Sequence, residues 1–330
     1  MLAESKEPSA TERTTDDMKV QSIAVAVLTY KRTDLLEKFL QAFAEMNKPE
    51  NADVALIVVD NDSSASAQAL VEDQRKTIAD IHYFVETRRG IPVARNRALD
   101  EALRLGADAL CFIDDDEYPD RDWLVALVAC WCDTGAHLIG GPVEVAPADS
   151  SAGAWQRFVN SSLASRMKRK NRSTADRAAN GGRYTVVTNN WLCDLNWQRE
   201  TGLRFDEKLL DTGGSDTVFF HDARTAGAVT DWSPDAVVHE TMTEDRLSLS
   251  YQFFRGASQS TNNFRRKHGK VSLPVALGTV VIAALRFVLG ALLLVIPIFG
   301  LASPVMATRS LGWSVGRVRA LFGGQSTLYQ

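Results

Sequence analysis

Four acidic residues stand side by side at positions 114–117, in the order Asp-Asp-Asp-Glu. Adjacent carboxylates repel one another, so such a run raises the free energy of the fold unless a cation or a bound proton offsets its charge. Carboxylate oxygens are the ligands that Mg2+ and Mn2+ prefer, and such an ion can also hold a diphosphate. The alternative is a solvated turn or a helix N-cap, where Asp is also favoured. The apolar stretch 109–113 before the run places it at the end of a strand, which favours the metal site.

The first 150 residues contain the elements that would position this run. Short β-rich stretches alternate with stretches of helical periodicity, which predicts a parallel sheet with helices on both faces. The expected strands are 23–29, 54–60, 81–86 and 109–113, and the expected helices are 33–46, 65–79 and 91–105. In such a Rossmann-like fold, ligands gather at the carboxyl ends of the strands.

Polar residues follow three of these strands, as that rule requires. They are Thr-Tyr-Lys-Arg at 29–32, Asp-Asn-Asp-Ser at 60–63 and the acidic run. A single polar group after a strand is common in any fold. Three such groups at successive strand ends predict one binding edge.

The rest of the chain is less regular. We expect a mobile loop or an irregular helix over 150–182, which is polar and basic. Further expected elements are strands over 184–195 and 236–239 and helices over 217–226 and 247–268. Residues 1–20 are polar without an apolar stretch, which predicts a flexible tail and not a signal peptide.

Composition excludes several classes of protein. The 330 residues are 45% hydrophobic with a formal net charge of -4, which excludes wholesale disorder and argues against a nucleic-acid partner. The four cysteines form no C-x-x-C pair, so neither a zinc knuckle nor a thioredoxin-like site is supported. Cys111 and Cys193 lie in apolar stretches and are expected in the core of a protein from a reducing compartment.

Five stretches together resemble the family-2 glycosyltransferases, whose catalytic domain has the GT-A nucleotide-diphospho-sugar transferase fold. They are Val-Leu-Thr-Tyr-Lys-Arg (27–32), Val-Val-Asp-Asn-Asp-Ser (58–63), Gly-Ile-Pro-Val-Ala-Arg-Asn (90–96), Phe-Ile-Asp-Asp-Asp-Glu (112–117) and Gly-Gly-Ser-Asp (213–216). Their order and spacing agree with the family over residues 23 to about 240. The stretch 94–100 is similar in particular to bacterial exopolysaccharide transferases of the succinoglycan type.

The resemblance implies a site for a nucleotide-diphospho-sugar. Its expected residues are Thr29, Tyr30, Arg32, Asp60, Asp62, Arg95, Asp114 and Asp115. Thr29 and Asp60 would line the base and ribose pocket, with Asp60 accepting from a uracil N–H, whereas Asp62 stands where the family often has Gly. Arg95 would approach the nucleotide or its diphosphate, because its planar charged fork fits anionic oxygen. The alternative for Arg95 is a solvent salt bridge on a helix face.

The resemblance also implies a metal site and a catalytic base. Asp114 and Asp116 match the two aspartates of the family's D-x-D motif, and Asp116 would be a direct ligand of Mg2+ or Mn2+. His239, after a short apolar strand, would contact the metal or diphosphate, or else be structural. Asp216 matches the base that deprotonates the acceptor hydroxyl, and it could also cap the following helix. The family usually has Glu-Asp where this chain has Ser215-Asp216, a difference that bears on how the acceptor is held.

The last sixty residues are strongly apolar. Residues 271–307 contain one charged residue, Arg286, and both flanks are basic. Residues 287–306 are long enough to cross a bilayer, and the basic flanks favour a cytoplasmic location for both ends, which predicts a hairpin or re-entrant pair turning near 286–290. The alternative is a buried helical hairpin or a dimer interface. The preceding arginines, at 246, 255, 265 and 266, would serve phosphate or membrane, or form a solvated helix face.

These inferences combine into one predicted organisation. It has a flexible tail (1–20), a GT-A catalytic domain (21–245) with a nucleotide half (21–147) and an acceptor half (148–245), and a basic amphipathic helix with an apolar membrane-associating tail (246–330). The resemblance implies an inverting, metal-dependent hexosyltransferase that uses a nucleotide-diphospho-sugar, expected to be a UDP-sugar. The apolar tail and its basic flanks add two expectations: a location on the cytoplasmic face of the bacterial inner membrane, and a lipid-linked saccharide or polysaccharide precursor as the acceptor. The alternatives are a non-catalytic nucleotide-sugar-binding or assembly protein, supported by Ser215, and a Mg2+-dependent phosphohydrolase built on the acidic run.

Overall fold

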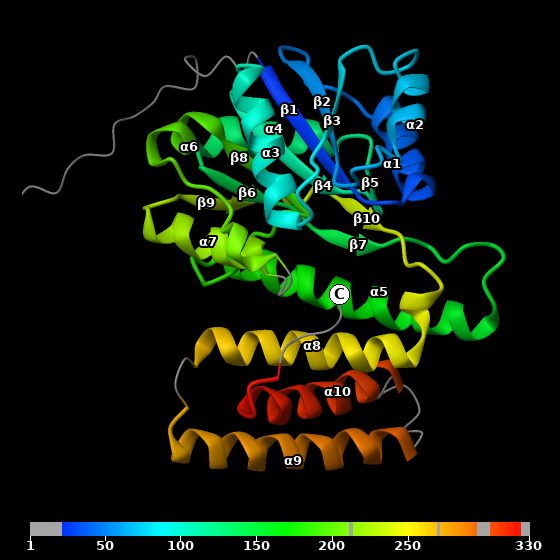
Figure 1. Cartoon of the computed structure of the whole chain (residues 1–330), viewed down its shortest axis with the longest axis vertical. Coiled ribbons are helices and arrows are strands. Elements are labelled where there is room, and N and C mark those ends of the chain that lie inside the picture. Colours follow the sequence, from blue (N-terminus) through cyan, green and yellow to red (C-terminus); the bar gives the residue numbers. More distant parts are fainter. Residues whose placement is uncertain (1–21, 211–213, 269–270, 296–303, 325–330) are drawn as a thin grey trace, which may run out of the picture.

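An α/β domain stacks on a layer of three helices in the computed structural model (Figure 1), which describes residues 22–210, 214–268, 271–295 and 304–324. The predicted flexible tail, 1–20, lies outside the described residues. The two parts follow from two kinds of sequence pattern. Short apolar strands build the sheet, and the long apolar and amphipathic stretches after residue 245 build the layer.

The main sheet has seven strands in the order β3-β2-β1-β4-β8-β6-β9. The first four are parallel and match the predicted strands: β1 (Ser22–Thr29), β2 (Asp53–Asp60), β3 (Ile81–Val85) and β4 (Ala109–Asp114). The remaining strands make the sheet mixed, because β8 (Asn190–Asp194) runs antiparallel to β4 and to β6 (Leu138–Gly140), while β9 (Thr230–Trp232) runs parallel to β6.

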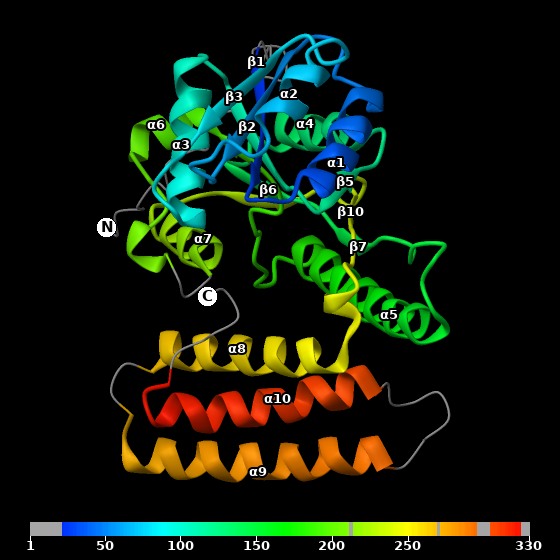
Figure 2. The same ribbon diagram turned by 45° about the vertical axis from the view of Figure 1, so that its right-hand side comes forward.

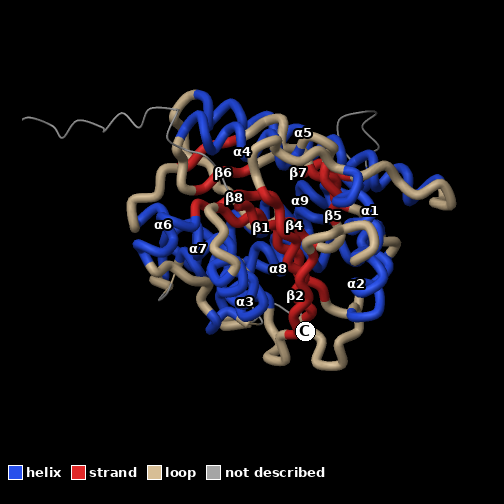
Figure 3. Tube along the Cα trace, turned by 90° about the horizontal axis from the view of Figure 1, so that it is seen from above, coloured by secondary structure: helices blue, strands red, loops and turns tan. Residues whose placement is uncertain are grey.

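Two hydrophobic cores cover the two faces of this sheet. Alternate residues of a strand point to opposite faces, so Val25 of β1 belongs to one core and Ala26 to the other. The first core is closed by α1 (Thr33–Glu45), α2 (Gln68–Gln74) and α4 (Trp123–Thr134). The second is closed by α3 (Ile91–Arg104), α6 (Leu195–Thr201) and α7 (Ser215–Thr225), as Figure 3 shows from above. Cys111 and Cys193 are buried in these cores, as predicted.

A second sheet of three short strands begins at Glu117, the last residue of the acidic run. Its order is β5-β10-β7, with β5 (Glu117–Pro119), β10 (Val238–Glu240) and β7 (Val143–Val145). β10 pairs antiparallel with β5 and parallel with β7. This small sheet therefore brings residues near 240 next to the end of the acidic run.

The prediction of a mobile loop or irregular helix over 150–182 is wrong. The segment forms α5 (Ala154–Ala179), one regular helix of 26 residues. Alanine, lysine and arginine are good helix formers, and the side chain of Gln156 accepts a hydrogen bond from Gly153 N–H at the helix start. The expected strand over 184–195 forms only in its second half, as β8.

The predicted hairpin turning near 286–290 is also wrong. After η2 (Asp245–Leu247) and α8 (Leu249–Lys267), the helix α9 runs without interruption over Leu273–Val295, and α10 follows over Pro304–Leu321. The three long helices lie side by side, with α10 between α8 and α9 (Figures 1 and 2). A Cβ atom added at Gly312 or Gly316 of α10 would overlap a backbone carbonyl of α8, so these glycines permit close helix packing.

Candidate active site

The carboxyl ends of β1, β2 and β4 bring the predicted nucleotide-binding residues together. In the strand register Thr29 lies beside Asp60, and Leu28 lies beside Asp114. The polar groups that follow three separate strands therefore form one edge, as the sequence predicted. This edge is the topological site at which open α/β sheets bind ligands.

Asp60 is fully buried and already accepts three hydrogen bonds from its own chain. Its donors are Asp62 N–H (3.0 Å), Ala67 N–H (2.8 Å) and Tyr83 Oη–H (2.8 Å). A carboxylate has about four acceptor positions, so these three hydrogen bonds leave one position unused. Burial and the Asp60 carboxylate both raise the pKa of Tyr83, which keeps this hydroxyl a donor.

Asp62 belongs to the loop that follows β2. Its Oδ1 accepts from Ser64 N–H at 3.2 Å, and its Oδ2 accepts from the Ser64 hydroxyl. These hydrogen bonds lower the pKa of Asp62. Asp62 thus holds the loop beside Asp60, a structural contact that the sequence did not predict.

Tyr30 stands at the exposed rim of this edge. The guanidinium of Arg89 lies 4.9 Å from the centre of its ring, in cation–π geometry. Arg89 comes from the loop before α3. The same loop is fixed from the β2 side by Asn61, whose Oδ1 accepts from Gly90 N–H at 2.8 Å. Gly90 has φ 143°, a backbone conformation that residues with a side chain rarely adopt, so a substitution there is strained.

The acidic run is buried, so its interpretation as a solvated turn is wrong. Thr29 Oγ1 donates to Asp115 Oδ2 at 2.9 Å, and Arg32 Nη1 lies 3.3 Å from Asp115 Oδ1. Asp116 Oδ2 lies 2.7 Å from Arg246 Nη2 and 3.5 Å from Arg32 Nη1. The predicted donor-site residues Thr29, Arg32 and Asp115 are therefore in direct contact.

Negative charge exceeds positive charge around the run. The four carboxylates of the run, Asp114, Asp115, Asp116 and Glu117, share the neighbourhood with three arginines, Arg32, Arg95 and Arg246. Glu240 adds a fifth carboxylate, whose charge Arg255, Arg246 and Lys170 oppose. Burial and then Asp116 raise the pKa of Asp114 to about 7, and burial raises that of Asp115 to about 6. The pKa values of Glu117 and Glu240 are raised as well, chiefly by burial.

This donor set has the chemistry of a divalent-cation site. Hard carboxylate oxygens suit Mg2+ or Mn2+, and an added double charge would offset the excess negative charge. Within the described ranges no group of three or more His, Cys, Asp or Glu side chains already converges in a metal-binding arrangement. The carboxylates of Asp114 and Asp116 therefore have the chemistry that such an ion needs. In this structure Asp116 forms an ion pair with Arg246.

The described contacts of His239 are with residues outside the acidic run, so its role as a metal ligand stays a prediction. Its Nε2 lies 2.7 Å from Asp120 Oδ1, and its ring stacks on Tyr118 at 5.1 Å. In the strand register His239 pairs with Tyr118, and Glu240 pairs with Glu117. Because neighbouring strand residues face opposite ways, Glu240 and not His239 faces the run.

Glu240 and Arg246 are the site residues that sequence reasoning missed or placed only loosely. Arg246 Nη1 donates to Glu240 Oε1 at 3.0 Å while its Nη2 contacts Asp116, so one guanidinium joins both carboxylates. The period-two alternation of the short strand around His239 is the signal that could have found Glu240. Arg246 was grouped only with other basic residues of the C-terminal part.

Arg95 is buried at the start of α3, so its interpretation as a solvent salt bridge is wrong. It is 9% exposed, its Nη1 donates to Ser215 Oγ at 3.0 Å, and its guanidinium lies over the ring of Phe205 at 5.5 Å. Its charge opposes the rise in the pKa of Asp114. Arg95 therefore connects the acidic run with Ser215, the position where the family usually has Glu.

Asp216 lies in the first turn of α7 and does not cap it. The N-cap is Gly214, with φ 87°, and the side chain of Asp216 accepts only from Thr217 Oγ1, at 3.4 Å, among the described contacts. The interpretation of Asp216 as the helix cap is wrong. An acidic side chain at this end is favourable to the helix dipole, and its carboxylate keeps free acceptor positions.

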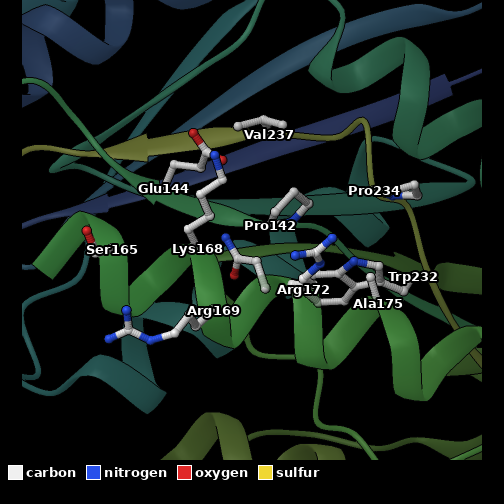
Figure 4. A pocket seen from close by; sticks show the side chains of 11 residues that line it. Pro142, Glu144, Ser165, Lys168, Arg169, Arg172, Ala175, Trp232, Pro234 and Val237 are labelled. Atoms are coloured by element: carbon white, nitrogen blue, oxygen red, sulfur yellow. The ribbon is translucent and has the colours of Figure 1, made fainter. Parts of the chain in front are cut away.

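A cavity lies between α5 and the small sheet. It has a volume of about 760 Å³ and is lined by α5 side chains, including Lys168, Arg169 and Arg172, together with Glu144 and Trp232 (Figure 4). Glu144 pairs in register with His239, away from Glu240. The side chains around the cavity include none of the site residues predicted within the described chain.

Comparison with known proteins points to the family that the sequence motifs resemble. Residues 24–195 match the family described as Glycosyl transferase family 2. The chain is 37% identical over 230 residues to the succinoglycan biosynthesis protein ExoM of Rhizobium meliloti (strain 1021), which covers 69% of this chain and 70% of that protein.

Solved structures confirm the predicted GT-A-like α/β fold. The mannosyltransferase PcManGT from Pyrobaculum calidifontis, in complex with GDP-Man and Mn2+, superposes with a TM-score of 0.61 at 18% identity, covering 91% of this chain and 87% of that one. S. aureus TarS 1-349, in complex with UDP-GlcNAc, superposes with a TM-score of 0.52 at 14% identity, covering 92% and 93%. At these identities the likeness is one of fold.

Proposed function

Because the chain belongs to the family-2 glycosyltransferases, we propose that it transfers a hexose, with inversion, from a nucleotide-diphospho-sugar to a lipid-linked saccharide or polysaccharide precursor. The observation that carries this proposal is the strand register that sets Thr29 beside Asp60 and Leu28 beside Asp114. The similarity to a succinoglycan biosynthesis protein supports a role in bacterial exopolysaccharide synthesis.

The donor is proposed to bind across this edge with its base near Asp60. The one acceptor position left on Asp60 suits a single N–H, such as that of uracil, and Thr29 lies beside Asp60 in the strand register. A UDP-hexose is therefore the proposed donor. The structural neighbours were solved with different nucleotides, GDP-Man in PcManGT and UDP-GlcNAc in TarS, so the test must include both bases.

The diphosphate is proposed to lie over the acidic run. A Mg2+ or Mn2+ ion held by Asp114 and Asp116 would stabilise negative charge on the departing diphosphate. Arg32 and Arg246 already place two further positive charges beside Asp116. Arg95, buried under the run, holds Ser215 at the start of α7 and so sets the distance between the donor edge and Asp216.

Asp216 is the proposed general base. The acceptor hydroxyl oxygen forms a bond to the anomeric carbon as the bond from that carbon to the diphosphate oxygen breaks, and the electron pair leaves with the nucleoside diphosphate. The hydroxyl proton passes to the Asp216 carboxylate. Free acceptor positions on this carboxylate support the role, because a carboxylate used as a helix cap would be occupied.

The acceptor is proposed to be membrane-bound because α9 is built to meet lipid. Leu273–Leu294 is long and apolar enough to cross a bilayer, and only 11% of it is buried against the rest of the structure. Exposed residues such as Leu277, Ile282 and Leu285 form its outer surface. We propose that α9 associates with the cytoplasmic face of the bacterial inner membrane, with basic residues of the layer facing anionic lipid.

A nucleotide-sugar-binding assembly protein without transferase activity is the second candidate. The observation that favours it is Ser215, which contacts Arg95 where most relatives have a carboxylate. A serine, unlike a glutamate, places no negative charge beside Asp216 on the acceptor side of the site. Loss of transfer in the variant Asp216→Asn, with donor binding retained, excludes this candidate.

A screen of nucleotide-sugars tests the proposed function. We expect one UDP-hexose to raise the melting temperature of the full-length protein only with Mg2+ or Mn2+, and we expect mass analysis to find one added hexose on a lipid-linked acceptor. The variant Asp114→Asn should lose the metal-dependent shift. Release of phosphate without sugar transfer would instead support a phosphohydrolase and overturn the proposal.

A further inference from the structure

Four cationic side chains lie where α5 meets α8 and α10. We call Arg166 and Lys170 of α5, Arg255 of α8 and Arg309 of α10 the interlayer cluster. On α5, Leu163 is buried in a small core with Leu247 of η2 and Val305 of α10. Arg166 and Lys170 follow Leu163 at i+3 and i+7, so they project from the same face of α5 toward the helical layer.

The side chains of α8 fix Arg309 at this junction. Arg309 Nη1 donates to Gln252 Oε1 at 2.6 Å, and its Nη2 donates to Gln259 Oε1 at 2.8 Å. Arg255 lies between these two glutamines at helical spacing, so it shares the face of α8 that meets Arg309. Arg309 is 9% exposed, and its two hydrogen-bond partners are neutral amides. A buried guanidinium without a carboxylate partner is costly unless an anion arrives.

The four charges act on one another. Burial, then Arg255, lowers the pKa of Arg166, and burial, then Arg166 and Arg255, lowers that of Arg309 to about 10. Burial and Arg166 lower the pKa of Lys170, whereas Glu240 and Asp216 raise it. Glu240 interacts with Arg255 and Lys170 of the cluster as well as with Arg246. The carboxylates that act most strongly on the four cations of the cluster are therefore two, Glu240 and Asp216.

The cluster lies between the reaction site and the apolar helix. Lys170 is within electrostatic range of Asp216, the proposed base, while Arg309 belongs to α10, which packs on α9. Figures 1 and 2 show the same order in space, with α5 above α8 and α10 between α8 and α9. An acceptor whose lipid lies in a membrane at α9 would have to pass the interlayer cluster to reach Asp216, the proposed base.

We propose that the interlayer cluster binds the phosphate or diphosphate group that joins the acceptor saccharide to its lipid. This inference rests on the proposed function, because it assumes a lipid-linked acceptor. Guanidinium forks bind phosphate oxygens in pairs, and a lysine adds a mobile point charge. The donor diphosphate is a separate anion, since the arginines that touch the acidic run are Arg32 and Arg246, outside the cluster.

Binding to vesicles tests the proposal without any enzymatic turnover. The full-length protein is titrated with phosphatidylcholine vesicles that contain farnesyl diphosphate, or farnesol at the same content, and separately with UDP and Mn2+. The test variant is Arg166→Gln with Lys170→Gln. The control is Lys168→Gln with Arg172→Gln, which removes two charges from the cavity side of the same helix.

We expect the wild-type protein and the control to prefer farnesyl diphosphate vesicles over farnesol vesicles. We expect the test variant to bind the diphosphate vesicles about tenfold or more weakly, because hydrogen bonds to charged groups are lost, with UDP binding unchanged. The single variant Lys170→Gln should show part of the same loss, and it replaces the double variant if that one fails to fold.

Equal diphosphate binding by the wild-type protein and the test variant would overturn the inference. An equal loss in the control would also overturn it, because general charge would then explain binding. A parallel loss of UDP binding would assign the cluster to the donor. The proposed function fails separately: a wild-type protein that selects farnesyl diphosphate through the cluster but transfers no sugar would contradict the function, and only diphosphate binding by the cluster would stand.

Discussion

Arg246 Nη2 lies 2.7 Å from Asp116 Oδ2, so an arginine from the connection to the helical layer holds the aspartate that is expected to bind metal. The same guanidinium reaches Glu240 at 3.0 Å. All three side chains are largely buried. Arg246 and a divalent ion would therefore both offset the negative charge of Asp116.

Replacing Arg246 with Gln should destabilise the protein most when no divalent ion is present. The change removes the guanidinium that joins two buried carboxylates, Asp116 and Glu240, and removing one partner of a buried ion pair typically costs about 3 kcal/mol. Chemical denaturation should show this loss in chelator, and Mn2+ should restore a large part of it. The matched control is Arg204→Gln, which breaks an exposed pair with Asp100 and should cost at most about 1 kcal/mol. A loss that Mn2+ leaves unchanged would contradict the expected role of Asp116.

Replacing Asp216 with Asn should remove transfer and keep donor binding. Loss of a general base lowers kcat by roughly 100-fold to 10,000-fold, whereas the donor edge around Asp60 is untouched. Sugar transfer is measured by mass analysis and donor affinity by thermal shift. The control, Asp222→Asn, changes an exposed carboxylate on the same helix, and its transfer rate should equal that of the wild-type protein. Full activity in the Asp216 variant would assign the base elsewhere.

Replacing Asp60 with Asn should weaken both the fold and nucleotide binding. Asp60 now accepts hydrogen bonds from Asp62, Ala67 and Tyr83. The NH2 group of an asparagine would face at least one of these donors and could not accept its hydrogen bond. One mispaired buried group costs about 1–3 kcal/mol of unfolding free energy. The control is Asp53→Asn, at the exposed start of the same strand, which should change stability by less than about 0.5 kcal/mol. Unchanged stability of the Asp60 variant would contradict the described hydrogen bonds.

Replacing Gly312 with Ala should loosen the helical layer. The added Cβ atom would overlap the carbonyl group of Phe253, so α8 and α10 must separate, at a cost of about 1–3 kcal/mol. Limited proteolysis should then cleave the C-terminal helices faster. The control is Gly278→Ala on α9, where nothing lies within 4 Å of the new Cβ atom, and this variant should gain up to about 1 kcal/mol of helix stability. Equal proteolysis rates would contradict the α8–α10 contact.

Replacing Leu285 with Glu should weaken membrane association. Leu285 is among the most exposed apolar residues of α9, and a buried charge in lipid costs about 2.5 kcal/mol or more. Flotation with vesicles of anionic phospholipid measures the bound fraction. Leu105→Glu, on an exposed apolar side chain at the end of α3, is the control and should leave flotation unchanged. Equal flotation of the wild-type protein and the Leu285 variant would contradict the role proposed for α9.

The strands and their polar ends were predictable because the signal is local. A buried parallel strand is a continuous apolar stretch, and its carboxyl end lies where the polar residues begin, so Thr29, Asp60 and Asp114 could be grouped before any fold was known. The family resemblance added the roles. Both kinds of information depend on residues that are neighbours in the chain.

The other contacts depend on pairings between distant segments. Glu240 joins the site only because β10 pairs with β5 in a register that sets Glu240 opposite Glu117, and no local pattern determines that register. Arg246 reaches Asp116 from 130 positions further along the chain. The hairpin near 286–290 was predicted from composition, but an uninterrupted helix has the same composition, and packing of α9 on α10 decides between them.

The short connection from β10 to α8 links the helical layer directly to the acidic run. Only five residues separate Glu240 from Arg246, and Leu247, next to Arg246, is anchored in the core shared by α5 and α10. The position of the helical layer and the charge balance of the acidic run therefore meet at one side chain, Arg246.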